Sequence, residues 1–490
     1  MPDDPYDRLP YTDHAYAESH PNRLAAVAHL SGWAPPELTR ARILEIGCAR
    51  GGNLLPMAAS LPGASLLGID RSERQIEEAA RVVEATGLAN TVFRRASFEE
   101  VELPPASFDF IVCHGLYSWI PVAARQVLLA SLARWLAPAG IAYVSFNTLP
   151  GWYERLPARD WLQHEAGDPA SLAWLREQIS PELGAYRQGI ERVLARLAET
   201  DRAYLVHEYL SEEHHPEYAG AFLREAEGAG LTYLGDAIPA HTALELLPDA
   251  VEAKARGRSA AEVQSIVDFV RCTSFRRALL VRADTCAARG WRFPHRLDPQ
   301  ALVELRIASR LRSNGDGFFR GARESVQVPD PAAHAALCEL ERVAPRSVPF
   351  RELLARVDGA GGSRDVARAG QENTLISELF DLWLATGELD LYVHEPAALT
   401  VAGESAKALE LARWQVQHAG AITNLWHQEV RLPDPLVRFV LSRLDGTRSL
   451  HALADEARSA GLLGHVSRAD GLELVRGSVH VLARSALLVT

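Results

Sequence analysis

Short apolar runs alternate with amphipathic helical patterns between residues 41 and 147. Each run has the length expected of a parallel strand that is buried on both faces. The intervening segments have helical periodicity, so the region has the alternation of βαβ units. The runs are Arg42–Ile46, Ser65–Asp70, Thr91–Arg94, Phe108–Cys113 and Ile141–Phe146. This pattern predicts an α/β domain built on a parallel sheet.

One predicted helix has recognisable signals at both ends. Its pattern covers Glu73–Thr86 and follows Ser72, whose side chain can cap the helix N-terminus. It stops at Gly87, a residue that favours helix C-termini. This helix is therefore predicted with defined boundaries.

Helical periodicity without strand patterns begins near residue 152. Apolar residues share one helix face at Ile190, Val193, Leu194 and Leu197. We predict a helical insertion over about residues 152–205. A helix over Glu217–Ala229 and a strand over Leu231–Gly235 then return the chain to the sheet.

The second half of the chain is predicted to be mainly helical. Residues 246–330 are arginine-rich, and the glycine–serine patch Asp358–Arg364 marks a loop or a domain edge. A later helix, ended by Asp445–Gly446, precedes further helices and the apolar Leu487–Val489. Its apolar face is formed by Leu436, Val440, Leu441 and Leu444. The predicted divisions are 1–245, 246–330, 331–400 and a winged-helix-like module at 401–490.

Length, charge and apolar content narrow the possible functions. A chain of 490 residues is expected to form two to four domains. The net charge of 51 − 63 = −12 disfavours nucleic acid as a partner. We find neither an apolar stretch long enough to cross a membrane nor a signal peptide. We therefore expect a cytoplasmic protein without membrane insertion.

The cysteine and lysine positions add two expectations. The five cysteines are scattered and never in CxxC spacing, which favours free thiols and argues against a zinc site. They are Cys48, Cys113, Cys272, Cys286 and Cys338. Lys254 and Lys407 are the chain's two lysines. If the protein modifies lysine, we expect that lysine on a partner.

A glycine-rich loop follows the first predicted strand. Glycines at this place let the backbone turn tightly and approach a ligand closely. The spacing is G-x-x-x-G-G, which differs from the G-x-G-x-x-G of dinucleotide-binding loops. A carboxylate at Glu45 would repel pyrophosphate but suits the amino group of a methionine moiety. The predicted cofactor-binding residues of this loop are Glu45, Gly47, Cys48, Gly51, Gly52 and Asn53.

Further cofactor contacts are predicted after the second, third and fourth strands. Asp70 stands at the tip of the second strand, where a carboxylate can accept both ribose hydroxyls; Arg71 follows it. Ser97 could bond an adenine, Phe98 could cover its face, and His114 follows the fourth strand. A tight turn and a helix cap would explain the loop and Asp70 separately. The ordered series favours a cofactor site.

These elements, in this order, resemble the class I S-adenosylmethionine-dependent methyltransferases. His114–Pro121 and Ser145–Trp152 further resemble signatures of a bacterial group that carries a methyltransferase regulatory domain. That group includes protein lysine methyltransferases (PKMT-like). Other matching segments are His207–Leu210, Gly230–Leu234, Asp268–Arg271, Phe275–Leu280 and Leu444–Arg448. The resemblance covers nearly the whole chain, and it implies a Rossmann-like sheet that binds S-adenosyl-L-methionine.

The sequence departs from the family pattern at several positions. Ala49 replaces a frequent glycine, and Ser97 replaces a frequent acid. Leu149 and Tyr153 stand where tyrosine and histidine are common. The last two flank the expected substrate cleft, so the departures concern the identity of the substrate.

Methyl transfer requires a positioned nucleophile and, for an amine, removal of its proton. The catalytic candidates follow strands four and five: His114, Tyr117, Trp119, Asn147 and Trp152. Tyr117 and Trp119 could sandwich an aliphatic chain or stabilise a cation through their rings. His114 could accept a proton, although a histidine after a strand is more often structural. Trp119 and Trp152 could equally be lid or core aromatics.

Three other features carry weaker signals. His207–Glu208 with His214–His215 lacks the spacing H-E-x-x-H, so no metal is predicted. The C-terminal module could bind DNA, but its acids and bases are balanced. The N-terminal tyrosines could belong to a solvated tail, whereas the resemblance implies a segment that covers the cofactor. These are Tyr6, Tyr11 and Tyr16.

The hypothesis favoured by the sequence is N-methylation of lysine side chains on a protein or peptide. The second half of the chain could recognise such a substrate and form a homodimer. One alternative is a methyltransferase that acts on a small molecule or a biosynthetic peptide. Another is a regulator that binds S-adenosyl-L-methionine without catalysis.

Overall fold

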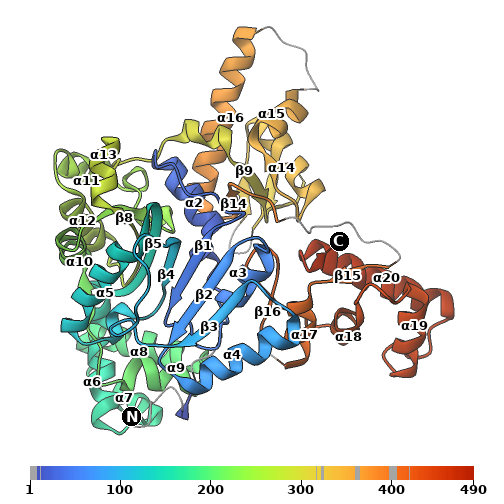
Figure 1. Ribbon diagram of the computed structural model, residues 1–490, viewed down its shortest axis with the longest axis horizontal. Helices are drawn as coiled ribbons and strands as arrows, with labels where there is room; N and C mark the ends of the chain where they lie inside the picture. The colour runs from blue at the N-terminus through green and yellow to red at the C-terminus, as the bar shows by residue number, and fades with distance from the viewer. Residues whose placement is uncertain are drawn as a thin grey trace.

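The structure of the protein is a computed structural model. It describes residues 8–10, 13–315, 317–321, 325–358, 365–396, 405–418 and 420–489, with the side chains at 358 and 365–369 left out. Figure 1 shows a central sheet with helices around it and a separate group of helices at the C-terminal end of the chain.

The central sheet has the strand order β3-β2-β1-β4-β5-β8-β7. Neighbouring strands from β1 to β5 are parallel, and β8 is antiparallel to both β5 and β7. The bounds are β1 Arg42–Ile46, β2 Ser65–Asp70, β3 Thr91–Arg95, β4 Phe108–Cys113, β5 Leu136–Leu149, β7 Leu231–Asp236 and β8 Phe275–Arg282. The five strands predicted between residues 41 and 147 are confirmed, and the strand near 231 does return to the sheet.

Both faces of the sheet are covered, which explains why the central strands β1, β4 and β5 are mostly apolar and buried. Ile43 and Phe110 pack on one face with helices α2 and α3, whereas Leu44 and Ile111 pack on the other with α5 and α10. The helices are α2 Pro21–Leu30, α3 Leu54–Ser60, α5 Val122–Trp135 and α10 Ala219–Gly228. The carboxyl ends of the parallel strands therefore form an edge between two helical layers.

Helix α4 covers Glu73–Thr86, as predicted from its end signals. The Ser72 hydroxyl accepts a hydrogen bond from the Gln75 amide at 3.2 Å. Gly87 follows the helix with a φ of +68°, the left-handed conformation that glycine adopts without strain.

The predicted helical insertion is present and has a small core of its own. Ile190 and Val193 are buried in this core, as their shared helix face suggested. Its helices are α6 Leu156–His164, α7 Pro169–Gln178, α8 Gly184–Ala198 and α9 Arg202–Leu205, followed by the π-helix η5 Val206–Leu210. The chain returns through strand β6, Glu217–Tyr218, which pairs with the end of β5. The helix expected from Glu217 therefore begins two residues later, at Ala219.

Residues 246–330 contain more strands than the sequence pattern suggested. Besides α11 Asp249–Ala255, α12 Ala260–Arg271 and α13 Ala283–Arg289, they supply β8 to the central sheet. Three arginines in β8 interrupt its apolar pattern and conceal it. The boundary placed at residue 245 was wrong, because it divides the strands of one sheet.

The boundary at residue 330 also divides a sheet. Strand β9 pairs with both β13 and β14, which lie beyond that boundary. The elements of this region are β9 Arg306–Ser309, β10 Arg312–Ser313, β11 Phe318–Arg320, β12 Ser325–Gln327, α14 Pro331–Val343, β13 Val348–Pro349, α15 Phe350–Asp358, α16 Asp365–Thr386 and β14 Leu389–Tyr392. The glycine–serine patch lies outside the described residues after residue 358.

The C-terminal module has the helices and short strands of a winged helix. Leu436, Val440 and Leu441 are buried on α18, and β15 pairs with β18. The elements are β15 Lys407–Ala408, α17 Glu410–His418, β16 Ile422–Thr423, β17 Glu429–Val430, α18 Pro435–Arg443, α19 Leu450–Ser459, α20 Arg468–Arg484 and β18 Leu488–Val489. Helix α17 packs beside α3 and α4 of the sheet domain, as Figure 1 shows.

All five cysteines are free thiols, as expected, and their exposure differs. Cys48, Cys113 and Cys286 are buried, whereas Cys272 is exposed at the C-terminus of α12. The chain after Cys272 lies against the end of β5, where the Gly151 amide donates to the Thr273 carbonyl oxygen at 3.0 Å.

A buried arginine joins α12 to the central sheet. Arg276 of β8 donates from Nε to Asp268 at 2.9 Å and from Nη1 to the Gln264 side chain at 2.9 Å. A second acid, Asp236 at the end of β7, lies 3.8 Å from Nη1. Arg276, Asp268 and Asp236 are almost completely buried. Their mutual neutralisation therefore stabilises the packing of α12 on β7 and β8.

We predict that Arg276→Leu lowers the stability of this domain by about 3–5 kcal/mol, because it leaves two buried carboxylates without their cation. The midpoint of thermal unfolding should fall strongly. Arg351→Leu removes an exposed arginine 2.7 Å from Glu304 and should shift the midpoint little. Equal shifts in the two variants would contradict this account.

Candidate functional site

The candidate site lies at the carboxyl ends of β1, β2, β4 and β5. Open α/β sheets bind ligands at this edge, where loops leave the strands. The loop after β1 turns through Gly47 with a φ of +72° and Gly51 with a φ of +81° before α3 begins. The structure therefore brings together the predicted glycine loop and the residues that follow the neighbouring strands.

Glu45 near the end of β1 is 3% exposed and incompletely paired. Its Oε1 accepts a hydrogen bond from Asn53 Nδ2 at 2.6 Å, while its Oε2 has no partner among the described residues. Burial raises the pKa of Glu45 to about 8, against the opposing effect of the Asn53 bond. A buried carboxylate of this kind fits a ligand with a positively charged amino group.

The carboxylate of Asp70 is oriented by two backbone amides at the end of β2. Ala49 N donates to Oδ2 at 3.0 Å, and Ser72 N donates to Oδ1 at 2.9 Å. Asp70 remains half-buried, which suits a predicted acceptor of ribose hydroxyls. Arg71, the next residue, is exposed.

The three predicted glycines of the loop differ in what surrounds them. A Cβ at Gly51 would lie 2.6 Å from the Phe93 ring, so this glycine is required by packing against β3. A Cβ at Gly52 would lie 2.6 Å from Asp13 Cβ, so the N-terminal segment rests on this residue. At Gly47 the nearest neighbour would be Leu116 at 3.9 Å. Of these three glycines, Gly47 is therefore the one whose Cβ position is uncrowded.

The predicted adenine contacts are less developed than the ribose contact. Ser97 accepts a hydrogen bond from the Glu99 amide at 3.3 Å and so shapes its own turn after β3. Phe98 is 8% exposed and packs with the apolar core beside Ile46 and Ile69. The roles of Ser97 and Phe98 toward adenine stay predictions.

His114 follows β4 and is enclosed by aromatic side chains. Its ring stacks on Tyr16 with centroids 3.5 Å apart, and its Nδ1 lies 2.9 Å from the Tyr143 hydroxyl. Burial lowers the pKa of His114 to about 3. An imidazole of such low basicity is poorly suited to the proton-accepting role that we considered for it.

Tyr117 was wrongly placed among the residues that contact substrate. Its side chain is fully buried in the helical layer on the α5 and α10 side of the sheet. The hydroxyl donates to Glu225 at 2.7 Å, and Arg125 lies 4.4 Å from the ring centroid. The short helix η2, Tyr117–Trp119, turns Tyr117 into the core. The sequence could not show which residues of this single turn face inward.

Trp119, Trp152 and Asn147 gather around a histidine that we did not predict as a site residue. The His214 ring lies 4.6 Å from that of Trp119 and 4.3 Å from that of Trp152, between centroids. Its Nε2 lies 3.1 Å from Asn147 Nδ2. Burial lowers the pKa of His214 to about 3, which makes the ring neutral. We call these four residues the aromatic cluster.

The return of the helical insertion carries His214 to this place. Strand β6 pairs with Thr148 and Leu149, and the His215 amide donates to the Ser118 carbonyl oxygen at 2.9 Å. The segment is thus fixed between the ends of β4 and β5. His214 is distant in sequence from both strands, and its local pattern contains no signal for this position.

Residues 13–20 form an N-terminal strap over the same edge. The Tyr16 amide donates to Asn53 Oδ1 at 2.9 Å, and its ring covers His114. Arg50 of the loop pairs with Asp13 at 3.2 Å. Tyr6 and Tyr11 lie outside the described residues, so the prediction of a covering segment concerns Tyr16 alone.

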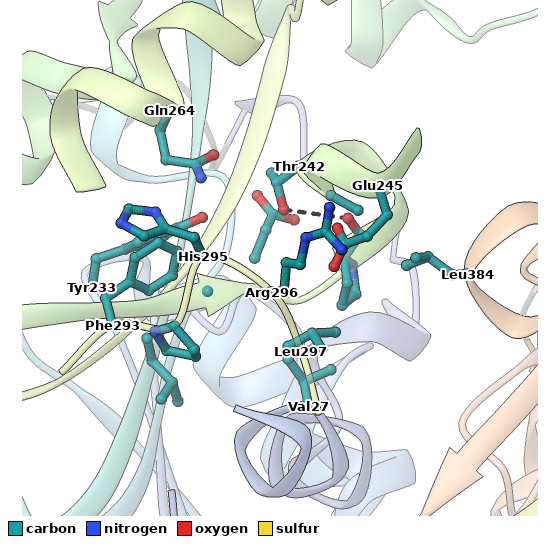
Figure 2. Close-up of a pocket in the computed structure, with 16 residues that line it drawn as sticks. Val27, Tyr233, Thr242, Glu245, Gln264, Phe293, His295, Arg296, Leu297 and Leu384 are labelled. Atoms are coloured by element: carbon teal, nitrogen blue, oxygen red, sulfur yellow. Dashed lines mark hydrogen bonds between the residues drawn. The ribbon is translucent and has the colours of Figure 1, made fainter. Parts of the chain in front are cut away.

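Figure 2 shows a hollow beside β7, lined by Tyr233, Gln264, His295 and Arg296. Its volume of about 40 Å³ suits a few water molecules. The Nε2 atom of His207 lies 2.7 Å from the Leu9 carbonyl oxygen, within hydrogen-bonding distance. The described residues contain no metal-binding group of three acidic, histidine or cysteine side chains, and no helix suited to span a membrane.

Three family models match this chain. Residues 43–140 match a methyltransferase domain. Residues 201–282 match a predicted methyltransferase regulatory domain, which crosses our expected boundary at residue 245 and takes in β8. Residues 404–470 match the C-terminal winged helix domain of PKMT. The three matches occur in the order that the sequence resemblance implied.

Relatives and a solved structure extend the comparison over the chain. An uncharacterized protein of Rickettsia prowazekii is 26% identical over 489 residues, covering 95% of this chain and 87% of its own length. A second uncharacterized protein of Rickettsia prowazekii is 30% identical over 233 residues, which cover 45% of this chain and 93% of that protein. The structure of PKMT2 from Rickettsia typhi in complex with AdoHcy shares the fold, with a TM-score of 0.85, 23% identity, and 98% and 100% of the two chains covered. The chain therefore belongs to the S-adenosylmethionine-dependent methyltransferases that carry a methyltransferase regulatory domain and a PKMT-type winged helix domain.

Proposed function

We propose that this methyltransferase modifies lysine side chains on a protein substrate. The observation that carries the proposal is the aromatic cluster, in which Trp119 and Trp152 flank the neutral His214 beside Asn147. Indole rings attract a cation and pack along an aliphatic chain. The fold shared with PKMT2 supports the same substrate class.

We further propose that the cofactor lies along the edge from Glu45 to Asp70. The unpaired oxygen of Glu45 would bind the amino group, and Asp70 would bind the ribose. Gly47 leaves the backbone accessible between them. When bound, S-adenosyl-L-methionine supplies a methyl group that its sulfonium already activates.

The aromatic cluster suits the acceptor side of this reaction. Transfer would break the sulfur–methyl bond, leave S-adenosylhomocysteine and form a nitrogen–methyl bond, so the amine would first have to lose its proton to water. Surroundings of low polarity lower the pKa of an ammonium group, because they disfavour its charge. Trp119, which is half-buried, would provide such surroundings, with the fully buried Trp152 packed behind His214, and Asn147 could orient the nitrogen. Catalytic roles are assigned to these residues and not to Tyr117 or His114.

Several earlier expectations remain predictions beside this proposal. They are the cytoplasmic location, the homodimer, the absence of a nucleic-acid partner and the division of the chain at residue 400. The alternatives are a methyltransferase with a small-molecule substrate and a non-catalytic regulator, and a labelling experiment distinguishes them from the lysine methyltransferase.

Incubation with methyl-labelled cofactor and bacterial lysate should place label in the protein fraction, as methyl-lysine after hydrolysis. Trp119→Leu should reduce this labelling by about tenfold or more, because it removes about 1–2 kcal/mol of cation–ring attraction and part of the apolar surface. Trp174→Leu, at a tryptophan 54% exposed on α7, is the matched control and should label normally.

The distribution of label decides between the hypotheses. Label confined to small molecules would replace the lysine proposal with the small-molecule alternative. Retained cofactor binding without any transfer would favour the regulator.

Asp70→Ala should weaken S-adenosylhomocysteine binding by about ten- to a hundredfold, since a charged hydrogen-bond partner contributes about 1.5–3 kcal/mol. Calorimetry measures the affinity. Asp109→Ala is the control, because Asp109 pairs with Arg42 at 2.8 Å at the opposite end of the parallel strands. If both variants bind as tightly as the wild type, the ribose site is misplaced.

Gly47→Ala should weaken binding of the same ligand by about tenfold or more, corresponding to about 1.4 kcal/mol, because its Cβ enters the space left above the loop. Gly87→Ala is a matched control, since its φ of +68° is close to the +72° of Gly47 and its Cβ would also be uncrowded. Both substitutions strain the backbone by about 1–2 kcal/mol. An equal affinity in the two variants would mean that the loop only makes a turn.

A further inference from the structure

A hairpin of the winged-helix module reaches the candidate cofactor site. Strands β16 and β17 pair antiparallel, and His427 lies in the turn between them. His427 is fully buried and has a φ of +59°, a left-handed conformation that is uncommon for a non-glycine residue. Its Nε2 lies 2.8 Å from Asn53 Oδ1, across 374 residues of sequence.

The contact adds a donor to the Asn53 amide oxygen, whose place is set by the Tyr16 amide and to which Ser19 Oγ donates at 3.2 Å. Oδ1 of an amide only accepts, so His427 Nε2 must carry the proton that it donates. The Tyr16 amide donates to the same oxygen at 2.9 Å. With Oδ1 held by these donors, Nδ2 is directed at Glu45 Oε1, 2.6 Å away. The reversed amide would place two oxygens against each other at Glu45.

The same hairpin also holds the N-terminal strap. Glu429 of β17 lies 3.0 Å from His14 Nδ1 and accepts from the Ala15 amide at 3.3 Å. These two residues directly precede Tyr16, whose ring covers His114. The strap is thus attached at one end to the glycine loop through Asp13 and along its length to the winged-helix module.

We infer that His427 and Glu429 are positioning residues for cofactor binding, so that the winged-helix module completes the cofactor site. His427 acts through Asn53 on Glu45, and Glu429 acts through residues 14–15 on the strap. The inference rests on the proposed binding of S-adenosyl-L-methionine at Glu45 and Asp70. The winged-helix module would then support cofactor binding, which a domain that only recognises the substrate would not do.

The test compares His427→Leu with His427→Gln in the full-length protein. Leucine cannot donate to Asn53, whereas the amide of glutamine can reach the same distance as Nε2. A neutral hydrogen bond contributes about 0.5–1.5 kcal/mol, so His427→Leu should weaken S-adenosylhomocysteine binding by about three- to tenfold. His427→Gln should restore most of this affinity. His480→Ala, at an exposed histidine of α20, is the control and should bind as the wild type does.

Thermal unfolding without ligand is measured on each variant, because a merely structural His427 would change stability and leave affinity unchanged. Glu429→Gln tests the second contact at a more exposed position and should weaken binding by about threefold. It also keeps the inference testable if His427→Leu does not fold.

Unchanged affinity in His427→Leu, or equal losses in the leucine and glutamine variants, would overturn the role of His427. Unchanged affinity in Glu429→Gln would overturn the role of the strap contact. These results differ from failure of the proposed function itself. In that case the wild type would not bind S-adenosylhomocysteine, or Asp70→Ala would bind it normally, and the inference would fall with the proposal.

Discussion

Burying a carboxylate beside apolar strands costs several kcal/mol unless hydrogen bonds or an opposite charge compensate for it. Glu45 is in this situation with a single neutral donor, and its raised pKa is the consequence. The surrounding structure is organised around that donor. Asn53 directly precedes α3, and its side-chain oxygen contacts the strap at Tyr16 and the C-terminal module at His427. Three distant parts of the chain therefore meet at one amide, and an ammonium group of the proposed cofactor would complete the compensation.

The parts predicted from sequence are those with local causes. The strands β1 to β4 follow from apolar runs of the right length, and α4 follows from Ser72 and Gly87. The glycine loop and Asp70 could be predicted because their spacing along the chain determines their meeting at one edge. Strand β8 lacked such a cause, since its arginines form ion pairs that only the folded protein shows.

The remaining site residues depend on contacts between distant segments. His214 reaches the aromatic cluster because a two-residue strand pairs with β5, and Tyr117 is turned away by a single short helix. His427 belongs to a module for which the sequence predicted helices and a terminal apolar segment but no hairpin. These contacts could not be predicted from residue spacing or periodicity, because they depend on how separate elements pack. Most of the candidate site was thus named from the sequence, including Trp119, Asn147 and Trp152, whereas His214 and the contact of His427 with Asn53 were not.

The unequal exposure of the cysteines makes the enzyme suitable for site-selective labelling. Burial raises the pKa of Cys48 and Cys113, so alkylating reagents will find little thiolate at either residue. Cys272 is exposed, and the backbone that follows it touches Gly151, the residue before Trp152. In a variant without the partly exposed Cys338, a fluorophore attached to Cys272 would lie beside the segment that carries Trp152. The arrival of a polypeptide could then be followed optically.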